Sequence, residues 1–234
     1  MSNAPSNPVF VAIDTADPAR ARALGAAAGP HVGGIKLGLE FFCRLGPDGV
    51  RQIAGTRPLF LDLKLHDIPN TVAGGVRAVA PLVPFLLTVH AAGGAAMMRA
   101  AVEAAAEATG GRTRILGVTV LTSLDESDLA AVGQARPTAA QVQRLAALAQ
   151  RSGLAGVVCS PHEVAMLRRE CGPEFLLVVP GIRPVGAALG DQKRVMSPAE
   201  AMAAGASYLV IGRPITAAAD PEAAARGIAE SLAA

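Results

Sequence analysis

Aromatic side chains, cysteines and net charge are all scarce in this chain of 234 residues, which has no tryptophan, one tyrosine and a net charge of +2. So small a charge, with so few stacking aromatics, does not indicate a surface for nucleic acid or for a membrane. The three cysteines, Cys43, Cys159 and Cys171, are odd in number and follow no metal-ligand spacing, so neither a disulfide framework nor a zinc cluster is expected. We therefore expect a cytoplasmic protein, and any nucleotide that it binds is expected to be a small molecule.

Long apolar runs are also missing, because charged residues, proline and glycine interrupt each candidate. No run is long enough to cross a bilayer, and the chain does not start with a basic segment followed by an apolar one. We therefore expect neither membrane insertion nor secretion. The first eight residues are small and polar, which predicts a flexible tail over 1–8 and a single domain over 9–234.

Short apolar runs of strand length recur eight times, with Ala-rich segments of helical spacing between them. The predicted strands are Val9 to Ile13, Gly34 to Leu37, Leu59 to Leu63, Phe85 to Val89, Ile115 to Val120, Gly156 to Cys159, Leu176 to Val179 and Tyr208 to Ile211. Helical segments such as Ala95 to Ala108 are long enough to return the chain for a parallel strand. The alternation predicts the α/β class and a (β/α)₈ TIM barrel. An open, doubly wound sheet is the alternative, but no Gly-x-Gly-x-x-Gly follows the first strand.

Three charged residues lie on and just beyond the third apolar run, in the segment Phe60-Leu-Asp-Leu-Lys-Leu-His-Asp-Ile-Pro-Asn-Thr71. Side chains two apart on a strand share a face, so Asp62 and Lys64 are expected side by side, with Asp67 where the strand gives way to a loop. A buried ion pair without further function is the alternative interpretation. Because burying a charge costs on the order of several kcal/mol, a functional role explains the array better.

Other polar residues follow or end apolar runs, where a TIM barrel has its active site. Asp14 ends the first run, Lys36 lies on the second, and Thr122 and Ser123 follow the fifth. Taken singly, Asp14 is also explained as a helix cap before Pro18, and Lys36 as an exposed lysine at a strand end. Taken with the charges of the third run, these residues predict one site.

The seventh and eighth runs end in segments suited to phosphate, Val179-Pro-Gly-Ile-Arg-Pro184 and Ile211-Gly-Arg-Pro-Ile215. Glycines let backbone N–H groups approach phosphate oxygens, and Arg213 offers a planar charged fork. Turn glycines beside a solvated Arg213 are the alternative. The segment from Gly186 to Arg194, rich in Gly and Ala, is expected to close over the site and exclude water.

The pattern Asp-x-Lys-x-x-Asp-Ile-Pro-x-Thr resembles the signature of the orotidine 5′-phosphate decarboxylase family, and further segments match from Val9 to about Ala219. The resemblance implies decarboxylation of orotidine 5′-monophosphate to uridine 5′-monophosphate in pyrimidine biosynthesis, with no metal and no organic cofactor. It also implies a homodimer. The implied catalytic array is Lys36, Asp62, Lys64 and Asp67, the last contributed by the neighbouring subunit. The implied ribose contacts are Asp14 and, across the interface, Thr71, and Lys36 is also implied to bind the substrate. The implied contact with the pyrimidine amide edge is Thr122. The implied phosphate contacts are Gln192, Gly212, Arg213 and the motif residue Arg183.

The implied reaction needs only fixed charges. Loss of CO₂ from C6 of the pyrimidine leaves electron density on a carbon that has no neighbouring carbonyl to accept it. Lys64 is expected to stabilise this carbanion and then protonate it, while Asp62 opposes the carboxylate of the substrate. Lys36 and Asp67 are expected to hold Lys64 and Asp62 in position.

Two other functions stay open. A metal-dependent sugar-phosphate decarboxylase or aldolase of the same superfamily shares the charged strand, although Lys36 stands where such relatives place an acidic metal ligand. A phosphate-binding barrel without turnover is the second alternative, but it has no need of both Asp62 and Lys64.

Three further residues near the predicted site are not expected to act in it. His90 is expected as a hydrogen-bonded residue behind the site, and His66 is expected to point toward helices or the subunit interface. Cys159 is expected to be a small buried residue.

Overall fold

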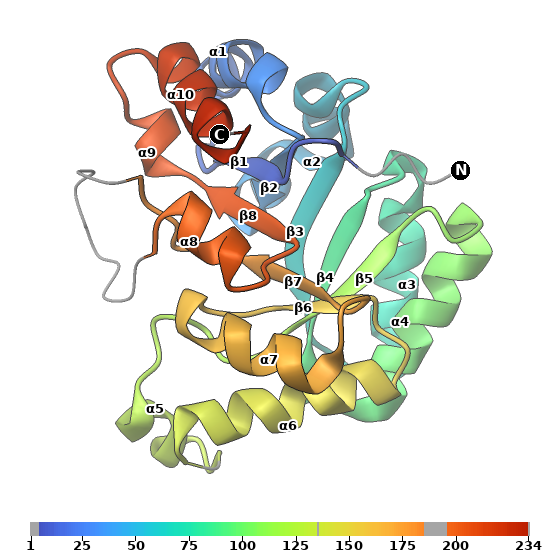
Figure 1. Cartoon of the computed structure of the whole chain (residues 1–234). Helices are drawn as coiled ribbons and strands as arrows, with labels where there is room; N and C mark the ends of the chain where they lie inside the picture. Colours follow the sequence, from blue (N-terminus) through green and yellow to red (C-terminus); the bar gives the residue numbers. More distant parts are fainter. Residues whose placement is uncertain (1–4, 135, 185–195, 234) are drawn as a thin grey trace.

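Eight parallel strands form a closed barrel in the computed structural model, which describes residues 5–134, 136–184 and 196–233 (Figure 1). Each strand is hydrogen-bonded to the next along the chain, and β8 closes on β1. The strands are β1 Val9–Ile13, β2 Gly34–Gly38, β3 Leu59–Leu65, β4 Leu86–His90, β5 Arg114–Val118, β6 Gly156–Val158, β7 Leu176–Val179 and β8 Tyr208–Ile211. The predicted (β/α)₈ barrel is confirmed, and the open, doubly wound alternative is wrong.

Helices surround the barrel and cover the outward face of its strands (Figure 1). The α-helices are α1 Pro18–Ala28, α2 Leu39–Ala54, α3 Pro69–Val79, α4 Gly94–Thr109, α5 Glu126–Ala131, α6 Thr138–Arg151, α7 Val164–Cys171, α8 Pro198–Ala203, α9 Arg213–Thr216 and α10 Pro221–Ala233. Short 3₁₀ turns are η1 Gly29–His31, η2 Ala80–Leu82, η3 Ala91–Gly93 and η4 Pro161–Glu163. Helix α2 is kinked at Gly46, which has φ of 60° and is followed by Pro47. Because glycine adopts this φ at little steric cost, the chain can turn there.

Apolar side chains fill both sides of the sheet. Outward-facing residues such as Val11 and Leu61 pack against helix residues such as Met97, and all three are fully buried. The alternating residues face the barrel interior, as expected for strands covered on both faces.

Four aromatic residues fill one end of the barrel interior, and we call them the aromatic floor: Phe10, Phe60, Phe85 and Tyr208. The ring of Phe10 lies 5.9 Å from that of Phe60, 6.2 Å from that of Phe85 and 5.5 Å from that of Tyr208, measured between centroids. All four come from the N-terminal parts of their strands or the residue just before one. This end of the barrel is therefore closed by packing.

Toward the C-terminal ends of the strands the same alternation brings polar residues inward. Lys36 is level with Ala12 on β1 and with Phe60 on β3, and Asp62 is level with Gly38. Asp62 therefore lies one inward-facing position nearer the C-terminal end than Lys36. The parallel register places charged groups of adjacent strands above the aromatic floor.

The flexible tail predicted over 1–8 stays a prediction. Within it, the side-chain amide of Asn7 donates to the carbonyl of His31 at 3.0 Å, and its oxygen accepts from the Val9 N–H at 2.9 Å. No helix of the described ranges is long and apolar enough to cross a membrane.

Candidate active site

A cavity of about 510 Å³ opens at the C-terminal end of the barrel. The predicted site residues that line it are Asp14, Lys36, Asp62, Lys64, Thr122, Arg183, Gly212 and Arg213. They come from the ends of six strands or the segments after them, so the fold collects residues that are far apart in the sequence. A larger cavity, of about 870 Å³, is lined by residues such as Arg57 and Phe85 at the other end of the barrel, and none of the predicted site residues lines it.

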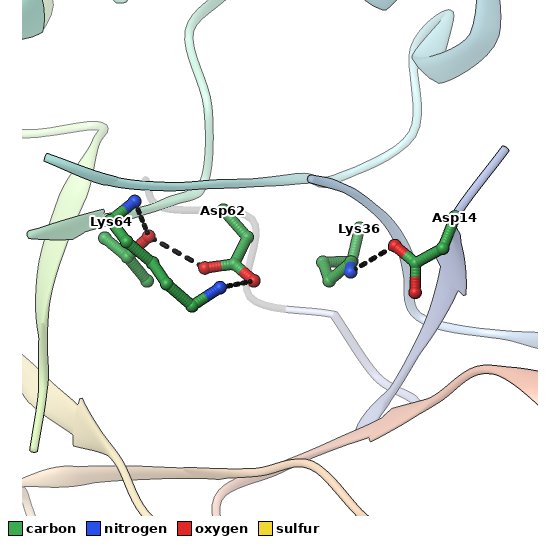
Figure 2. Close-up of polar contacts among 5 residues, drawn as sticks. Asp14, Lys36, Asp62 and Lys64 are labelled. Atoms are coloured by element: carbon green, nitrogen blue, oxygen red, sulfur yellow. Dashed lines mark hydrogen bonds and ion pairs between the residues drawn. The ribbon is translucent and has the colours of Figure 1, made fainter. Parts of the chain in front are cut away.

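Asp62 and Lys64 form an ion pair inside the cavity (Figure 2). The Nζ atom of Lys64 lies 2.7 Å from Oδ2 of Asp62, and the side chains are 36% and 13% exposed. The shared face predicted from their two-residue spacing is confirmed. The carboxylate is more enclosed than the ammonium, so the ammonium is the group that an entering ligand meets with less rearrangement.

The backbone of Lys64 adopts a left-handed conformation, with φ of 51°. For a residue with a side chain this conformation is uncommon and costs on the order of 1–3 kcal/mol. The pairing of β3 with β4 shifts at the same place: Leu61 pairs with Leu87, and the next pair is Leu65 with Val89. Strain and a broken register thus coincide with the lysine that points into the cavity.

A hydroxyl on the neighbouring strand holds this distorted segment. The Oγ1 of Thr88 accepts a hydrogen bond from the Lys64 N–H and donates one to Oδ1 of Asp62, both at 2.9 Å. Thr88 is fully buried and does not line the cavity. Sequence reasoning missed this residue. The available signal was Thr88 itself, a polar residue inside the largely apolar segment Leu86–His90. Phe60 pairs with Leu86, and Asp62 and Thr88 each lie two positions after these partners.

Lys36 forms a second ion pair, with Asp14, at 2.6 Å (Figure 2). The side chain of Lys36 is only 10% exposed, so the alternative of an exposed lysine at a strand end is wrong. Asp14 does not cap α1, because Asp17 accepts from the Ala19 N–H at 2.8 Å and fills that role. The array is thus two separate pairs, and the expected support of Lys64 by Lys36 stays a prediction.

Asp67 and Thr71 lie outside the cavity and are exposed. β3 ends at Leu65, and Asp67 sits in the loop before α3, where its Oδ1 accepts from the Ile68 N–H at 2.7 Å. Asp67 lines a separate, shallow cavity of about 550 Å³ with residues such as Ile68, which is 67% exposed. Within one chain, then, these two residues do not join the site.

The predicted phosphate residues lie where β7 and β8 end. Gly181 has φ of 77°, which favours glycine, and Arg183 is buried, with its backbone N–H donating to the carbonyl of Met196 at 3.0 Å. Arg213 is exposed at the start of α9 and lines the cavity. The predicted ligand Gln192 and the closing segment from Gly186 to Arg194 lie outside the described residues.

The three residues set aside earlier are found near the site. The rings of His66 and His90 lie 5.3 Å apart, and neither residue lines the cavity. Burial lowers the pKa of His90, and repulsion from His66 and Lys64 adds to this, while Asp62 acts in the opposite direction. Cys159 is buried at the cavity wall, and burial raises the pKa of its thiol, which suits a packing residue better than a nucleophile.

Acidic, histidine and cysteine side chains do not gather into a metal-binding group of three or more anywhere in the described ranges. The cysteines Cys43, Cys159 and Cys171 are free. The site is built from carboxylate, ammonium, guanidinium and hydroxyl groups at the C-terminal ends of the barrel strands.

The match to known proteins decides the family. Residues 7–228 match the model of the "Orotidine 5'-phosphate decarboxylase / HUMPS family". The chain belongs to this family. A protein of Rhodospirillum rubrum named orotidine 5'-phosphate decarboxylase is 58% identical, over 99% of this chain and 96% of its own. One of Thermobifida fusca with the same name is 57% identical, over 96% and 95%.

A solved structure supports the same assignment. The crystal structure of orotidine 5'-phosphate decarboxylase from Lactobacillus acidophilus superposes with a TM-score of 0.87 and is 38% identical, covering 98% of this chain and 100% of the other. The family's barrel is thus reproduced over nearly the whole chain. The resemblance read from the Asp-x-Lys-x-x-Asp-Ile-Pro-x-Thr segment is confirmed at the level of the family.

Proposed function

We propose that this chain decarboxylates orotidine 5′-monophosphate to uridine 5′-monophosphate, the reaction of pyrimidine biosynthesis, and that Lys64 delivers the proton to C6. Membership of the family and the identity of 57–58% to relatives named as this carboxy-lyase support the reaction. The observation that carries the mechanism is the Lys64–Asp62 pair at 2.7 Å inside the cavity.

The proposed step is heterolytic cleavage of the bond from C6 to the carboxylate. CO₂ leaves without the electron pair, which stays on C6 and is stabilised by the ammonium of Lys64. A proton then passes from Nζ to C6, giving uridine 5′-monophosphate and a neutral amine that is reprotonated from water. The anionic Asp62 repels the carboxylate of the substrate and loses that repulsion as neutral CO₂ departs, so the interaction favours the transition state over the bound substrate.

The lining of the cavity supports one orientation of the nucleotide. The proposed donors to the phosphate are the backbone of the Gly181 turn, which follows β7, and Arg213, which follows β8. Asp14, paired with Lys36 at the ends of β1 and β2, is the proposed partner of the ribose hydroxyls, and Thr122, which follows β5 and lines the cavity, is the proposed partner of the base. C6 then faces Lys64. Gln192 and Arg183 stay predicted phosphate contacts.

The test is a spectrophotometric assay for loss of orotidine 5′-monophosphate, run before and after exhaustive chelation. We expect full activity with EDTA, because the proposed charges all come from side chains. Activity that falls to background with EDTA and returns with Mg²⁺ would contradict the mechanism and favour the metal-dependent sugar-phosphate alternative. Binding of uridine 5′-monophosphate without turnover would favour the phosphate-binding barrel.

We also propose that the active protein is a homodimer in which Asp67 and Thr71 reach the neighbour's cavity. Both residues are exposed and lie outside the cavity of their own chain. Ile68, the residue after Asp67, is 67% exposed, and a large apolar side chain with that exposure suits a surface covered by a second chain. A two-fold interface makes the exchange reciprocal.

Subunit complementation tests the dimer. Lys64→Ala and Asp67→Ala proteins, each expected to be nearly inactive, are unfolded together and refolded. Each heterodimer then has one doubly defective site and one intact site, so random pairing restores about one quarter of all sites. Mixing Lys64→Ala with Asp62→Ala is the matched control, because these defects lie in one chain's own cavity and no intact site arises. Heterodimers seen by mass spectrometry without activity would show that Asp67 serves its own chain.

A cytoplasmic location stays a prediction of the same proposal. It rests on the three free cysteines, none of which forms a disulfide, as is usual in a reducing compartment. Cell fractionation followed by immunoblotting tests it.

A further inference from the structure

The bulge in β3 lies opposite a single residue of β4. Leu61 pairs with Leu87 and Leu65 pairs with Val89, so the three residues from Asp62 to Lys64 face only Thr88. Extra residues in one strand leave backbone groups without a ladder partner. Thr88 supplies that partner for Lys64, because its Oγ1 accepts from the Lys64 N–H at 2.9 Å. The hydroxyl thus takes the place of a backbone carbonyl where the register of β3 and β4 shifts.

The same hydroxyl completes a closed ring of contacts. It donates to Oδ1 of Asp62 at 2.9 Å, and the other oxygen, Oδ2, lies 2.7 Å from Nζ of Lys64. The ring therefore joins the backbone of Lys64 to the tip of its own side chain through Thr88 and Asp62. A hydroxyl has one proton to donate and lone pairs to accept with, so Thr88 makes both bonds without leaving a buried polar group unpaired.

Thr88 is placed to act on geometry rather than on substrate. It is fully buried and is absent from the cavity lining, so a nucleotide in the cavity does not touch it. Neither bond of the Thr88 hydroxyl involves the Nζ atom of Lys64, so a movement of the lysine tip toward a substrate would not have to break either of them.

We propose that Thr88 is a positioning residue, whose hydroxyl holds the strained backbone of Lys64 and the carboxylate of Asp62 in the geometry that proton delivery requires. The inference rests on the proposed function and deepens it. It requires that loss of the hydroxyl lower kcat while leaving the binding of nucleotide largely unchanged, because the proposed phosphate and base contacts lie elsewhere in the cavity.

One pair of substitutions isolates the hydroxyl. Thr88→Val keeps the shape and removes the oxygen, whereas Thr88→Ser keeps the oxygen and removes the methyl group. We expect kcat of Thr88→Val to fall by about 10²-fold, the size of effect that a small misplacement of a catalytic group produces. Thr88→Ser is expected to stay within about threefold of wild type, and both variants to bind uridine 5′-monophosphate like the wild type. If Thr88→Val does not fold, Thr88→Ala against Thr88→Ser makes the same comparison.

Thr109 provides a control for a purely structural hydroxyl. It is also buried, and its Oγ1 also makes two bonds, donating to the Ala105 carbonyl at 2.7 Å and accepting from the Thr113 N–H at 3.1 Å, at the end of α4. Thr109→Val should lower the melting temperature and leave kcat unchanged. If the wild-type protein turns over the substrate but Thr88→Val and Thr88→Ser have equal kcat, the positioning role is overturned and the proposed function is not. A wild type without turnover would overturn the proposed function and this role with it.

Discussion

The two ends of the barrel interior are built from opposite chemistry on the same strands. Toward the N-terminal ends lies the aromatic floor, where Phe10 contacts three other rings and is fully buried. Toward the C-terminal ends lie two ion pairs and the strained backbone of Lys64. Burial of each large apolar side chain contributes about 1.5–3 kcal/mol, which offsets strain of on the order of 1–3 kcal/mol elsewhere. We call the C-terminal end of the barrel interior the upper end. Burial in the aromatic floor thus stabilises the fold, and this stability offsets the strain at the upper end.

The sharpest test of this comparison is Lys64→Ala, which alters the upper end only. We expect decarboxylation to fall by ~10⁴-fold or more, because both proton delivery and charge stabilisation are lost. Affinity for uridine 5′-monophosphate, measured by calorimetry, should be largely kept, since the phosphate contacts are separate. Loss of nucleotide binding to the same extent as activity would place Lys64 in general binding instead.

The reciprocal test removes a ring from the floor. Phe10→Ala should cost about 3–5 kcal/mol of stability, because a fully buried ring leaves a cavity. Calorimetric melting measures the loss. At a temperature where the variant is fully folded, kcat should stay near that of the wild type. A fall in kcat comparable to that of an active-site variant would show that floor and site are not separable, and Phe10→Leu would grade the effect by volume.

A third test divides the upper end itself. Arg213→Ala should weaken uridine 5′-monophosphate by roughly 10- to 100-fold, the loss of a charged hydrogen bond worth about 1.5–3 kcal/mol. The same substitution should change little for orotidine, the nucleoside without the phosphate. Parallel binding measurements with both ligands decide the matter, and equal losses would contradict a phosphate contact.

The smallest expected effect is the pH dependence of stability that arises from His90, at the C-terminal end of β4. The pKa of His90 is lowered below 6.5, first by burial and then by His66 and Lys64, with Asp62 opposing. At pH values between that lowered pKa and about 6.5, the unfolded chain binds more protons at this histidine than the folded chain does. The stability that neutral His90 contributes is therefore fully present above about pH 6.5 and is lost as the pH falls through the lowered pKa.

Urea unfolding at several pH values from about 7.5 to 5 measures this loss. Wild type should lose more stability on acidification than His90→Gln, while the exposed His162→Gln should behave like wild type. Identical slopes for wild type and His90→Gln would contradict the role of burial.

The sequence predicted the strands of the barrel more completely than the geometry of the site. Strand positions were predictable because continuous apolar runs mark strands buried on both faces, and β1, β7 and β8 begin and end where predicted. The contact of Asp62 with Lys64 was predictable from the alternation of side chains. Alternation alone does not reveal the left-handed φ of Lys64, since that arises from a register shift against another strand.

Pairing preferences within the site were less predictable still. Lys36 lies on β2, between β1, which Asp14 follows, and β3, which carries Asp62. Only the three-dimensional positions show that Lys36 pairs with Asp14. Thr88 was missed for a related reason: its bonds join residues 24 and 26 positions apart, and neither pattern nor spacing carries such a contact.

The one tyrosine of this chain makes the floor optically distinct. Tyr208 is buried there among phenylalanines, and no tryptophan is present to mask it. Tyrosine emission in the unmodified protein therefore reports on the floor alone, whereas turnover reports on the opposite end. A denaturant titration followed by both signals gives two independent readings from a single sample. Coincident midpoints would identify the barrel as one cooperative unit, and earlier loss of turnover would give the free energy needed to loosen the catalytic end by itself.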